Sequence, residues 1–258
     1  MSALEKRYFL ISLYRSKVLL QSEGSRTLLR YFWWVLDPLL DMCLFYVVFG
    51  IMLQRGGPEF AASLLTGVIV ARFFILATSP APDLLIHNEH VLLTVYLPKY
   101  VFSVAHILTC LVKYLLLLAI LIVFLIFLGV PVTPRWLLLL PVTFFYSALT
   151  LGCVMILSGI TPFFPDFSQL FPKLSMLLYW GSGVFFKPED IIPGKYLSLF
   201  YVNPFAAYIR VYRECLLGGQ IEWFFWGGLA VASVLALGAG YCLLARYDRQ
   251  YPRVIAQE

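Results

Sequence analysis

The feature that most constrains this chain is an apolar segment at residues 28–53, LLRYFWWVLDPLLDMCLFYVVFGIML. The segment opens on Arg30 and an aromatic cluster, the pattern of a membrane-interface anchor followed by a span. Pro38 lacks a backbone amide donor, so the sequence predicts a helix boundary or kink there. A bilayer core about 30 Å thick needs about 20 helical residues. Residues 34–53 supply 20 of them, which predicts a first transmembrane span.

Composition extends this conclusion to the whole chain. Of its 258 residues, 61% are hydrophobic and 13% are charged, whereas soluble domains carry about 25% charged residues. The sequence therefore predicts a polytopic membrane protein. The net charge of +5 is spread over tails and loops, which is not the pattern of a nucleic-acid-binding protein. The five cysteines include no CxxC pair, and their odd number predicts no disulfide framework.

The hydropathy pattern predicts an all-α fold with six transmembrane helices in a single transmembrane domain, residues 1–258. A helix satisfies its own backbone hydrogen bonds, which a chain inside lipid requires. We expect the spans at residues 34–53, 61–78, 101–128, 136–160, 169–186 and 223–245.

Residues 1–27 are predicted to form an amphipathic interface helix on the cytoplasmic side. A mostly apolar helical face is shared by Leu4, Tyr8, Ile11, Arg15 and Val18. Basic residues lie off this face and suit an anionic membrane surface. Charged residues within the segment exclude a signal peptide, because they break any apolar h-region. A solvated cytoplasmic tail is the alternative.

The connection at residues 79–100 is predicted to be a cytoplasmic loop that contains one short helix. Pro80 and Pro82 end the second span, and residues 83–93 (DLLIHNEHVLL) can form a helix with Asp83 as its N-terminal acid.

The connection at residues 187–220 differs, because charges interrupt an apolar stretch too short to span. The break at Asn203-Pro204 predicts two short helices that dip into the membrane from outside and return. We therefore expect an external re-entrant region before the last span.

Charge distribution sets the predicted orientation. Six spans place both termini on one side of the membrane. Six basic residues precede the first span and three follow the last, so the positive-inside rule favours cytoplasmic termini.

The sequence offers no catalytic site. No GxxxxGK[ST] loop is present, so we expect the chain not to hydrolyse ATP. His87 and His90 could touch one metal ion, but the segment is not HExxH, and polar residues of a contact helix are the favoured interpretation. No nucleophile motif or acid–base pair indicates a membrane transferase. We therefore predict no catalytic residue, no metal site and no cofactor in this chain.

Charged residues inside the predicted spans are more informative. Arg72 and Lys113 lie within apolar runs, where a central charge costs about 2.5–3.5 kcal/mol on insertion scales. Such side chains face a bundle interior or a wet cavity, or they extend to the interface. These two cations lead us to expect an anionic cargo.

Two segments resemble the permease subunit of ABC-2-type polysaccharide exporters, which move capsular polysaccharide, O antigen and teichoic acid. Residues 28–50 look like that family's junction between the interfacial helix and the first span. Residues 182–219, SGVFFKPEDIIPGKYLSLFYVNPFAAYIRVYRECLLGG, are similar to its external re-entrant helices. The six-span layout also matches, and chain size and the stretch 203–214 are most similar to capsule-type permeases.

The resemblance implies a channel-forming subunit of an ATP-driven exporter that moves a lipid-linked capsular or O-antigen polysaccharide. It further implies a homodimer in the bacterial inner membrane, with ATP and Mg²⁺ bound by a pair of cytosolic ATPase subunits. Membrane lipids surround such a subunit, and no nucleic acid is expected. Whether periplasmic or outer-membrane export proteins complete the route stays open.

Within this interpretation, two sets of residues are expected to act. The substrate path is expected to include Phe32, Trp33, Trp34, Arg72, Lys113, Tyr179 and Trp180. The contact with the ATPase is expected to include Asp83, Leu84, Leu85, His87, Asn88, Glu89, His90 and Val91.

Two alternatives remain at this point. ABC-2 permeases for lipids or drugs share the same layout. A passive channel or scaffold would also be apolar and polytopic, but it would need no cytoplasmic docking helix.

Overall fold

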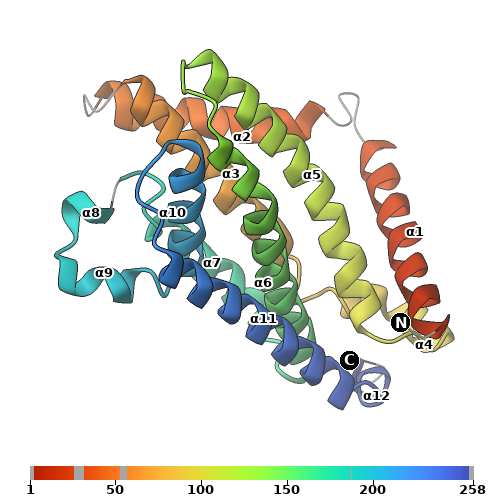
Figure 1. Cartoon of the computed structure of the whole chain (residues 1–258). Coiled ribbons are helices and arrows are strands. Elements are labelled where there is room, and N and C mark those ends of the chain that lie inside the picture. The colour runs from red at the N-terminus through yellow and green to blue at the C-terminus, as the bar shows by residue number, and fades with distance from the viewer. Residues whose placement is uncertain (1–2, 26–31, 53–56, 187, 256–258) are drawn as a thin grey trace.

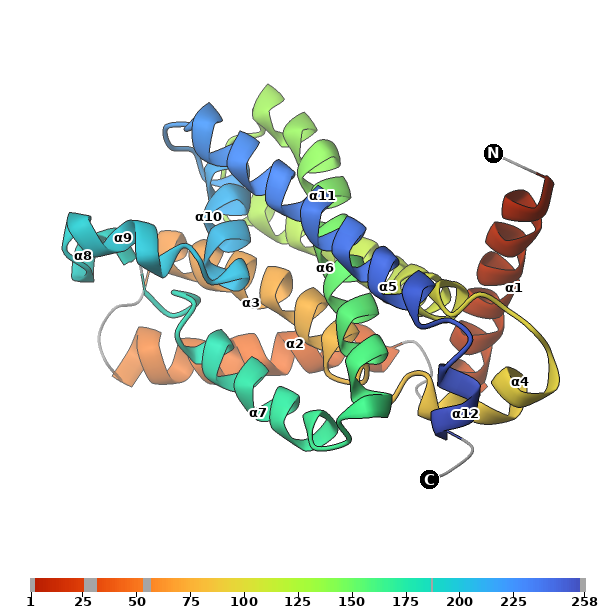
Figure 2. The same cartoon turned by 90° about the horizontal axis from the view of Figure 1, so that it is seen from below.

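The computed structural model describes residues 3–25, 32–52, 57–186 and 188–255, and every regular element in these ranges is a helix (Figures 1 and 2). The predicted all-α fold is therefore confirmed.

Within the described residues, four segments are long and apolar enough to cross a membrane. They are α3 (Pro58–Thr78), α5 (Tyr100–Phe127), the segment Pro134–Phe163 with α6 (Leu139–Ile160) at its centre, and α11 (Trp223–Arg246). They coincide with the second, third, fourth and sixth predicted spans, within a few residues at each end. Short 3-10 turns flank α6 on both sides, η3 (Pro134–Leu138) and η4 (Thr161–Phe163).

The first predicted span coincides with α2 (Phe32–Phe45), which continues as the π-helix η1 (Tyr46–Met52). The helix runs through residue 38, so the helix boundary predicted at that proline is wrong. A proline inside a helix loses one backbone hydrogen bond, and contacts with a neighbouring helix can offset this loss. That α2 and η1 together cross the membrane stays a prediction.

The fifth predicted span, residues 169–186, is wrong as a single helix. The structure has α7 (Phe167–Trp180), and the chain then turns through Gly183, whose φ is 74°. The 14 residues of α7 rise about 21 Å at 1.5 Å per residue, which is short of a bilayer core. Six spans are therefore not established, and four are supported.

The connection before α11 holds three short helices, α8 (Pro188–Ile191), α9 (Gly194–Phe200) and α10 (Pro204–Leu216). The predicted break at Asn203 is confirmed, because its side chain caps α10 by accepting the Phe205 amide at 3.0 Å. Both views show α8 and α9 projecting away from the end that holds the termini (Figures 1 and 2). That these helices re-enter the membrane stays a prediction.

The N-terminal helix, α1 (Ala3–Ser25), packs against α5 through small polar residues. Ser12 and Ser16 are buried there, and Thr109 donates to the Ser16 hydroxyl at 3.2 Å. Ile11 and Val18, from the face predicted to be apolar and membrane-facing, are exposed on the protein surface. The predicted helix is confirmed, and its contact with the membrane stays a prediction.

Both termini lie at one end of the molecule, together with α4 (Glu89–Thr94) and α12 (Tyr251–Ile255), as Figure 1 shows. α12 packs against α4. The α5–α6 connection lies at the opposite end (Figure 1). This arrangement agrees with the prediction that both termini and the 79–100 loop share one side of the membrane. We refer to this end as the terminal end and to the other as the distal end.

Four tyrosines form the centre of the helix bundle. Tyr146 stacks on Tyr208 with ring centroids 4.3 Å apart, and Tyr114 and Tyr212 meet Tyr146 edge-on. The Tyr146 hydroxyl donates to the Val70 carbonyl of α3 at 2.8 Å. These rings tie α3, α5, α6 and α10 together, and hydrogen bonds offset the burial of the Tyr146, Tyr208 and Tyr212 hydroxyl groups.

α6 and α11 make the most extensive helix–helix contact in the described structure. Glycines allow the two backbones to meet: a Cβ on Gly152 would lie 2.4 Å from the carbonyl carbon of Ala236, and one on Gly240 would lie 2.7 Å from the Gly152 oxygen. Small residues at such contacts are typical of helices that associate in membranes.

The close approach of α6 and α11 can be tested with two matched substitutions on α11. Gly240→Val should separate α6 from α11 and destabilise the protein by about 1–3 kcal/mol, as overpacking does. Gly238→Val is the control, because a Cβ there meets nothing within 4 Å. The measurement is the thermal unfolding temperature of the detergent-solubilised protein. Equal temperatures for the two variants would contradict the close approach.

Candidate functional site

The first group of predicted path residues centres on Arg72 of α3, which forms ion pairs with two carboxylates of α2. Its Nη1 lies 2.6 Å from Asp41 Oδ2, and its Nη2 lies 3.3 Å from Asp37 Oδ2. The two aspartates are four residues apart and therefore share one helical face. One guanidinium and two carboxylates give this cluster a net charge of −1. Arg72 therefore does not present an unpaired positive charge to a cargo, contrary to the expectation drawn from its position in the sequence.

The second group joins Lys113 of α5 to Trp34 of α2. The Lys113 side chain is 7% exposed, and its Nζ lies 5.0 Å from the centroid of the Trp34 ring. A cation above an indole face is an attractive contact. Lys113 is thus held inside the protein, and the structure brings two of the predicted path residues together.

The remaining predicted rings are distributed over α2 and α7. Phe32 and Trp33 are exposed at the start of α2. Trp180 stacks on Phe185 with centroids 4.9 Å apart, and Tyr179 meets the same ring edge-on at 5.7 Å. The seven predicted path residues therefore lie on α2, α3, α5 and α7, where direct contacts join Lys113 to Trp34 and Tyr179 to Trp180.

The loop at the terminal end differs from its prediction in secondary structure. The chain turns through residues 79–85, makes a 3-10 turn (Ile86–Asn88), and only then forms α4. The single helix predicted to start at Asp83 is wrong, because that carboxylate accepts a hydrogen bond from Ser168 at 2.7 Å and starts no helix. Asn88 instead accepts a hydrogen bond from Arg15 of α1.

Leu85 was expected to face a partner, and this expectation is wrong. Its side chain is 0% exposed and packs in a core cluster with Leu92, Phe102 and Tyr251. The C-terminal α12 covers it, and the local sequence gives no signal of that contact. Leu84 is half-buried against the same cluster.

The loop still presents an exposed apolar surface, formed by different residues. Leu93 is 51% exposed and Val95 is 53% exposed, beside Val91 and Tyr96. His87 and His90 are exposed, and Glu89 lies 3.8 Å from His90. Of the predicted contact residues, the exposed ones are therefore Val91 and the two histidines. We call Val91, Leu93, Val95 and Tyr96 the loop patch.

Asp248, near the C-terminus, holds the end of this loop. It accepts a hydrogen bond from the Tyr96 hydroxyl at 2.7 Å and lies 3.6 Å from the Lys99 ammonium, whose side chain is buried. The hydrogen bond to Asp248 raises the pKa of Tyr96. The loop is therefore fixed to the C-terminal segment, a link that sequence reasoning missed because the partners are far apart in the chain.

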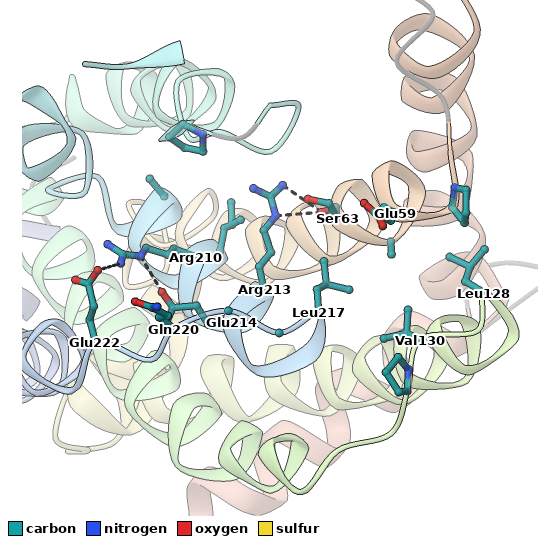
Figure 3. A pocket seen from close by; sticks show the side chains of 18 of the residues that line it. Glu59, Ser63, Leu128, Val130, Arg210, Arg213, Glu214, Leu217, Gln220 and Glu222 are labelled. Atoms are coloured by element: carbon teal, nitrogen blue, oxygen red, sulfur yellow. Dashed lines mark hydrogen bonds and ion pairs between the residues drawn. The ribbon is translucent and has the colours of Figure 1, made fainter. Parts of the chain in front are cut away.

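A cavity of about 640 Å³ opens at the distal end, and sequence reasoning did not predict it (Figure 3). Its walls come from the start of α3, the α5–α6 connection, α10 and residues 217–222. The charged residues in its lining are Glu59, Arg210, Arg213, Glu214 and Glu222. We call it the distal cavity.

Arg213 fixes one wall of this cavity. Its guanidinium donates to the carbonyls of Ser63 at 3.1 Å, Gly183 at 2.9 Å and Val184 at 2.9 Å. These acceptors belong to α3 and to the turn after α7. Gly67 leaves room for this contact, because a Cβ there would lie 3.1 Å from the Arg213 Nη2.

Arg210 lies three residues earlier on the same helix, α10, and is held by a second set of contacts. It pairs with Glu214 at 2.8 Å and with Glu222 at 2.7 Å, and it stacks over the rings of Tyr201 and Phe225. Glu214 also accepts a hydrogen bond from the Trp226 indole at 2.8 Å. Figure 3 shows Arg210, Glu214 and Glu222 grouped together, apart from Ser63 and Glu59 of α3.

Comparison with known proteins places this geometry in context. The ABC-2 type transporter family model matches residues 18–217. Two relatives from Klebsiella pneumoniae, both O-antigen export system permease protein RfbA, are 20% identical to this chain over 230 and 226 residues. The two alignments cover 89% and 87% of this chain, and 88% and 87% of the relatives.

The ion cluster on α2 and α3 generates a testable prediction. Arg72→Gln should leave Asp37 and Asp41 facing each other and lower the stability by about 1 kcal/mol, the scale of polar contacts between helices in membranes. The measurement is the thermal unfolding temperature in detergent. The triple variant Arg72→Gln, Asp37→Asn, Asp41→Asn should recover part of the loss, because no unpaired carboxylate remains. Wild-type stability of the single variant would contradict the pairing.

Proposed function

Because the chain belongs to the ABC-2 type transporter family, we propose that it is the membrane subunit of an ATP-driven exporter that moves a polysaccharide across the cytoplasmic membrane. The observation that carries this proposal is the extent of the similarity to O-antigen export permeases, which covers nearly nine-tenths of both chains. The family model matches residues 18–217, which include α3, α5, α6, the terminal-end loop and α10. Because both relatives are O-antigen permeases, we favour an O-antigen type of polymer over a capsular one.

The proposed assembly contains two copies of this chain and two cytosolic ATPase subunits that bind ATP and Mg²⁺. The terminal end would face the cytoplasm of a bacterial cell, because it holds both termini, the basic N-terminal helix and the 79–100 loop. The polymer would leave at the distal end, carried by its lipid. The similarity to O-antigen export permeases supports an exported carbohydrate as the cargo.

The loop patch supports a contact with an ATPase at the terminal end. Exposed apolar side chains on a rigidly held loop provide contact area, and the polar neighbours His87, Glu89 and His90 provide charge complementarity. Arg15 of α1 and Asp248 hold the loop in place. Because the loop connects α3 with α5 along the chain, a displacement of the loop would act on both helices. A loop with this support can transmit the ATPase stroke.

Genetic removal of the chain tests the proposed function. Cells that lack it should lose the surface polysaccharide and accumulate its lipid-linked precursor inside, and the wild-type gene should restore export. The purified chain alone should release no phosphate from ATP, whereas its complex with the ATPase should release it. Unchanged surface polysaccharide, or ATP hydrolysis by the chain alone, would contradict the proposal.

Paired substitutions test the loop patch. Leu93→Ser with Val95→Ser should weaken co-purification of the ATPase and reduce export, since these exposed side chains lie in the proposed contact. Val132→Ser is the matched control, because Val132 is 66% exposed in the α5–α6 connection at the distal end. Normal ATPase binding by the double variant would contradict the contact.

Comparison with Leu85→Ser distinguishes loss of the ATPase contact from loss of folding stability. This substitution removes a buried side chain and should lower the thermal unfolding temperature, as truncation of a core leucine costs about 2–5 kcal/mol. The Leu93→Ser, Val95→Ser variant should leave that temperature unchanged.

A further inference from the structure

The distal cavity has no part in the contact with the ATPase or in the ion cluster of α2 and α3. It lies beside the α5–α6 connection, at the end away from the termini and α4 (Figures 1 and 3). If the terminal end faces the cytoplasm, as the proposed function requires, the cavity lies where the polymer leaves the protein. Its volume of about 640 Å³ falls within the range of about 300–1,000 Å³ that ligand pockets occupy.

The lining combines aliphatic surfaces with hydrogen-bonding groups. Leu128, Val130 and Leu217 face Glu59 and Ser63 across the cavity (Figure 3). Pro58 and Pro131 extend the aliphatic surface near the same rim, and Gln220 adds an amide near Glu222. Carboxylates accept hydrogen bonds at both oxygens. A sugar ring matches such a lining, because its hydroxyl groups can donate to carboxylates while its C–H faces pack on aliphatic side chains.

The charges in the lining distinguish between classes of sugar. Both guanidinium groups are engaged, Arg210 with Glu214 and Glu222, and Arg213 with three backbone carbonyls. In the described part of the lining, two guanidinium groups and three carboxylates give a net charge of −1. A sugar that carries a carboxylate or phosphate would meet the exposed carboxylate of Glu59 and find both arginines occupied, and like charges repel. A neutral sugar meets no such barrier.

We propose that the distal cavity binds a neutral sugar unit of the emerging polymer and disfavours uronic acid and phosphate-bearing units. This inference rests on the proposed export of polysaccharide and names the class of polymer and the place where it is held. It replaces the anionic cargo expected from Arg72 and Lys113, because those cations are held by Asp37, Asp41 and the Trp34 ring. A site at the exit limits backward sliding of the polymer between strokes.

Cysteine labelling in cells tests occupancy of the cavity. Val130→Cys places a thiol in the lining, and Val132→Cys places one two residues along the same connection but outside the lining. Each variant is labelled with a membrane-impermeant maleimide, in cells that make the polymer and in cells blocked in its synthesis. The wild-type chain gives the background from its five native cysteines.

Labelling at residue 130 should be about threefold slower or more when polymer is made, which is the factor 1 + [L]/Kd for a ligand at about twice its Kd. Labelling at residue 132 should not change. Equal rates at residue 130 in both kinds of cell would overturn the proposal. Equal slowing at both residues would indicate a conformational change rather than an occupant, and no labelling at either would place the cavity away from the exit side. Equal slowing at both residues and the absence of labelling at both would each overturn the proposal as well.

Chemical analysis of the exported polymer tests the charge preference. The surface polysaccharide lost on deletion of this chain should consist of neutral sugars, and uronic acid or phosphate in its repeating unit would overturn the proposal. This result differs from failure of the proposed function, in which deletion would leave the surface polysaccharide unchanged.

Discussion

The distal half of the structure depends on one side chain, the guanidinium of Arg213. The turn after α7 leaves the helix at Gly181 and carries backbone carbonyls that no helix satisfies, while residues 182–185 are buried. An unsatisfied buried carbonyl costs free energy comparable to a lost hydrogen bond. Arg213 supplies donors to two carbonyls of this turn and to one carbonyl of α3, so it holds α10, α7 and α3 in one arrangement. Two of these elements, α3 and α10, form walls of the distal cavity. Non-helical backbone at membrane depth is tolerated only when protein buries it in this way.

Two helices connect the loop patch with the distal cavity. α3 begins in the cavity lining at Pro58 and ends beside the loop, and α5 runs from the loop back to Leu128 in the lining. They are joined along their length by a hydrogen bond between His106 and the Ala77 carbonyl at 2.9 Å and by stacking of Phe73 on Tyr114 at 4.6 Å. Under the proposed function, these two packed helices would transmit a displacement of the loop to the cavity.

Three cations within the bundle each have an attractive partner close by. Arg72 has two aspartates, Lys113 has an indole face, and Arg210 has two glutamates. A charge in a membrane protein is expensive unless it is paired or hydrated, so each pairing lowers the cost of keeping these residues in apolar helices. The position of a cation in the sequence therefore did not indicate the charge of the surface around it. The aspartates that neutralise Arg72 are 31 and 35 residues away in the chain, and only the packing of α2 on α3 shows that they meet it.

The sequence by itself determined the class of fold, four of the spanning helices, the break at Asn203 and the family, because each follows from local composition or from a pattern along the chain. A long apolar run in lipid satisfies its backbone hydrogen bonds by forming a helix, and an Asn-Pro step suits a helix start, with Asn as the N-cap and Pro at the first helical position. The sequence did not determine which side chain of the loop faces outward, because the burial of Leu85 depends on α12, about 170 residues later. Nor could it show the end of α7 at Trp180 in place of a full span, since the turn there is stabilised by Arg213 from α10. The distal cavity, the partners of Arg72 and the exposed loop patch were decided by tertiary structure alone, because each requires contacts between helices that are distant in the chain.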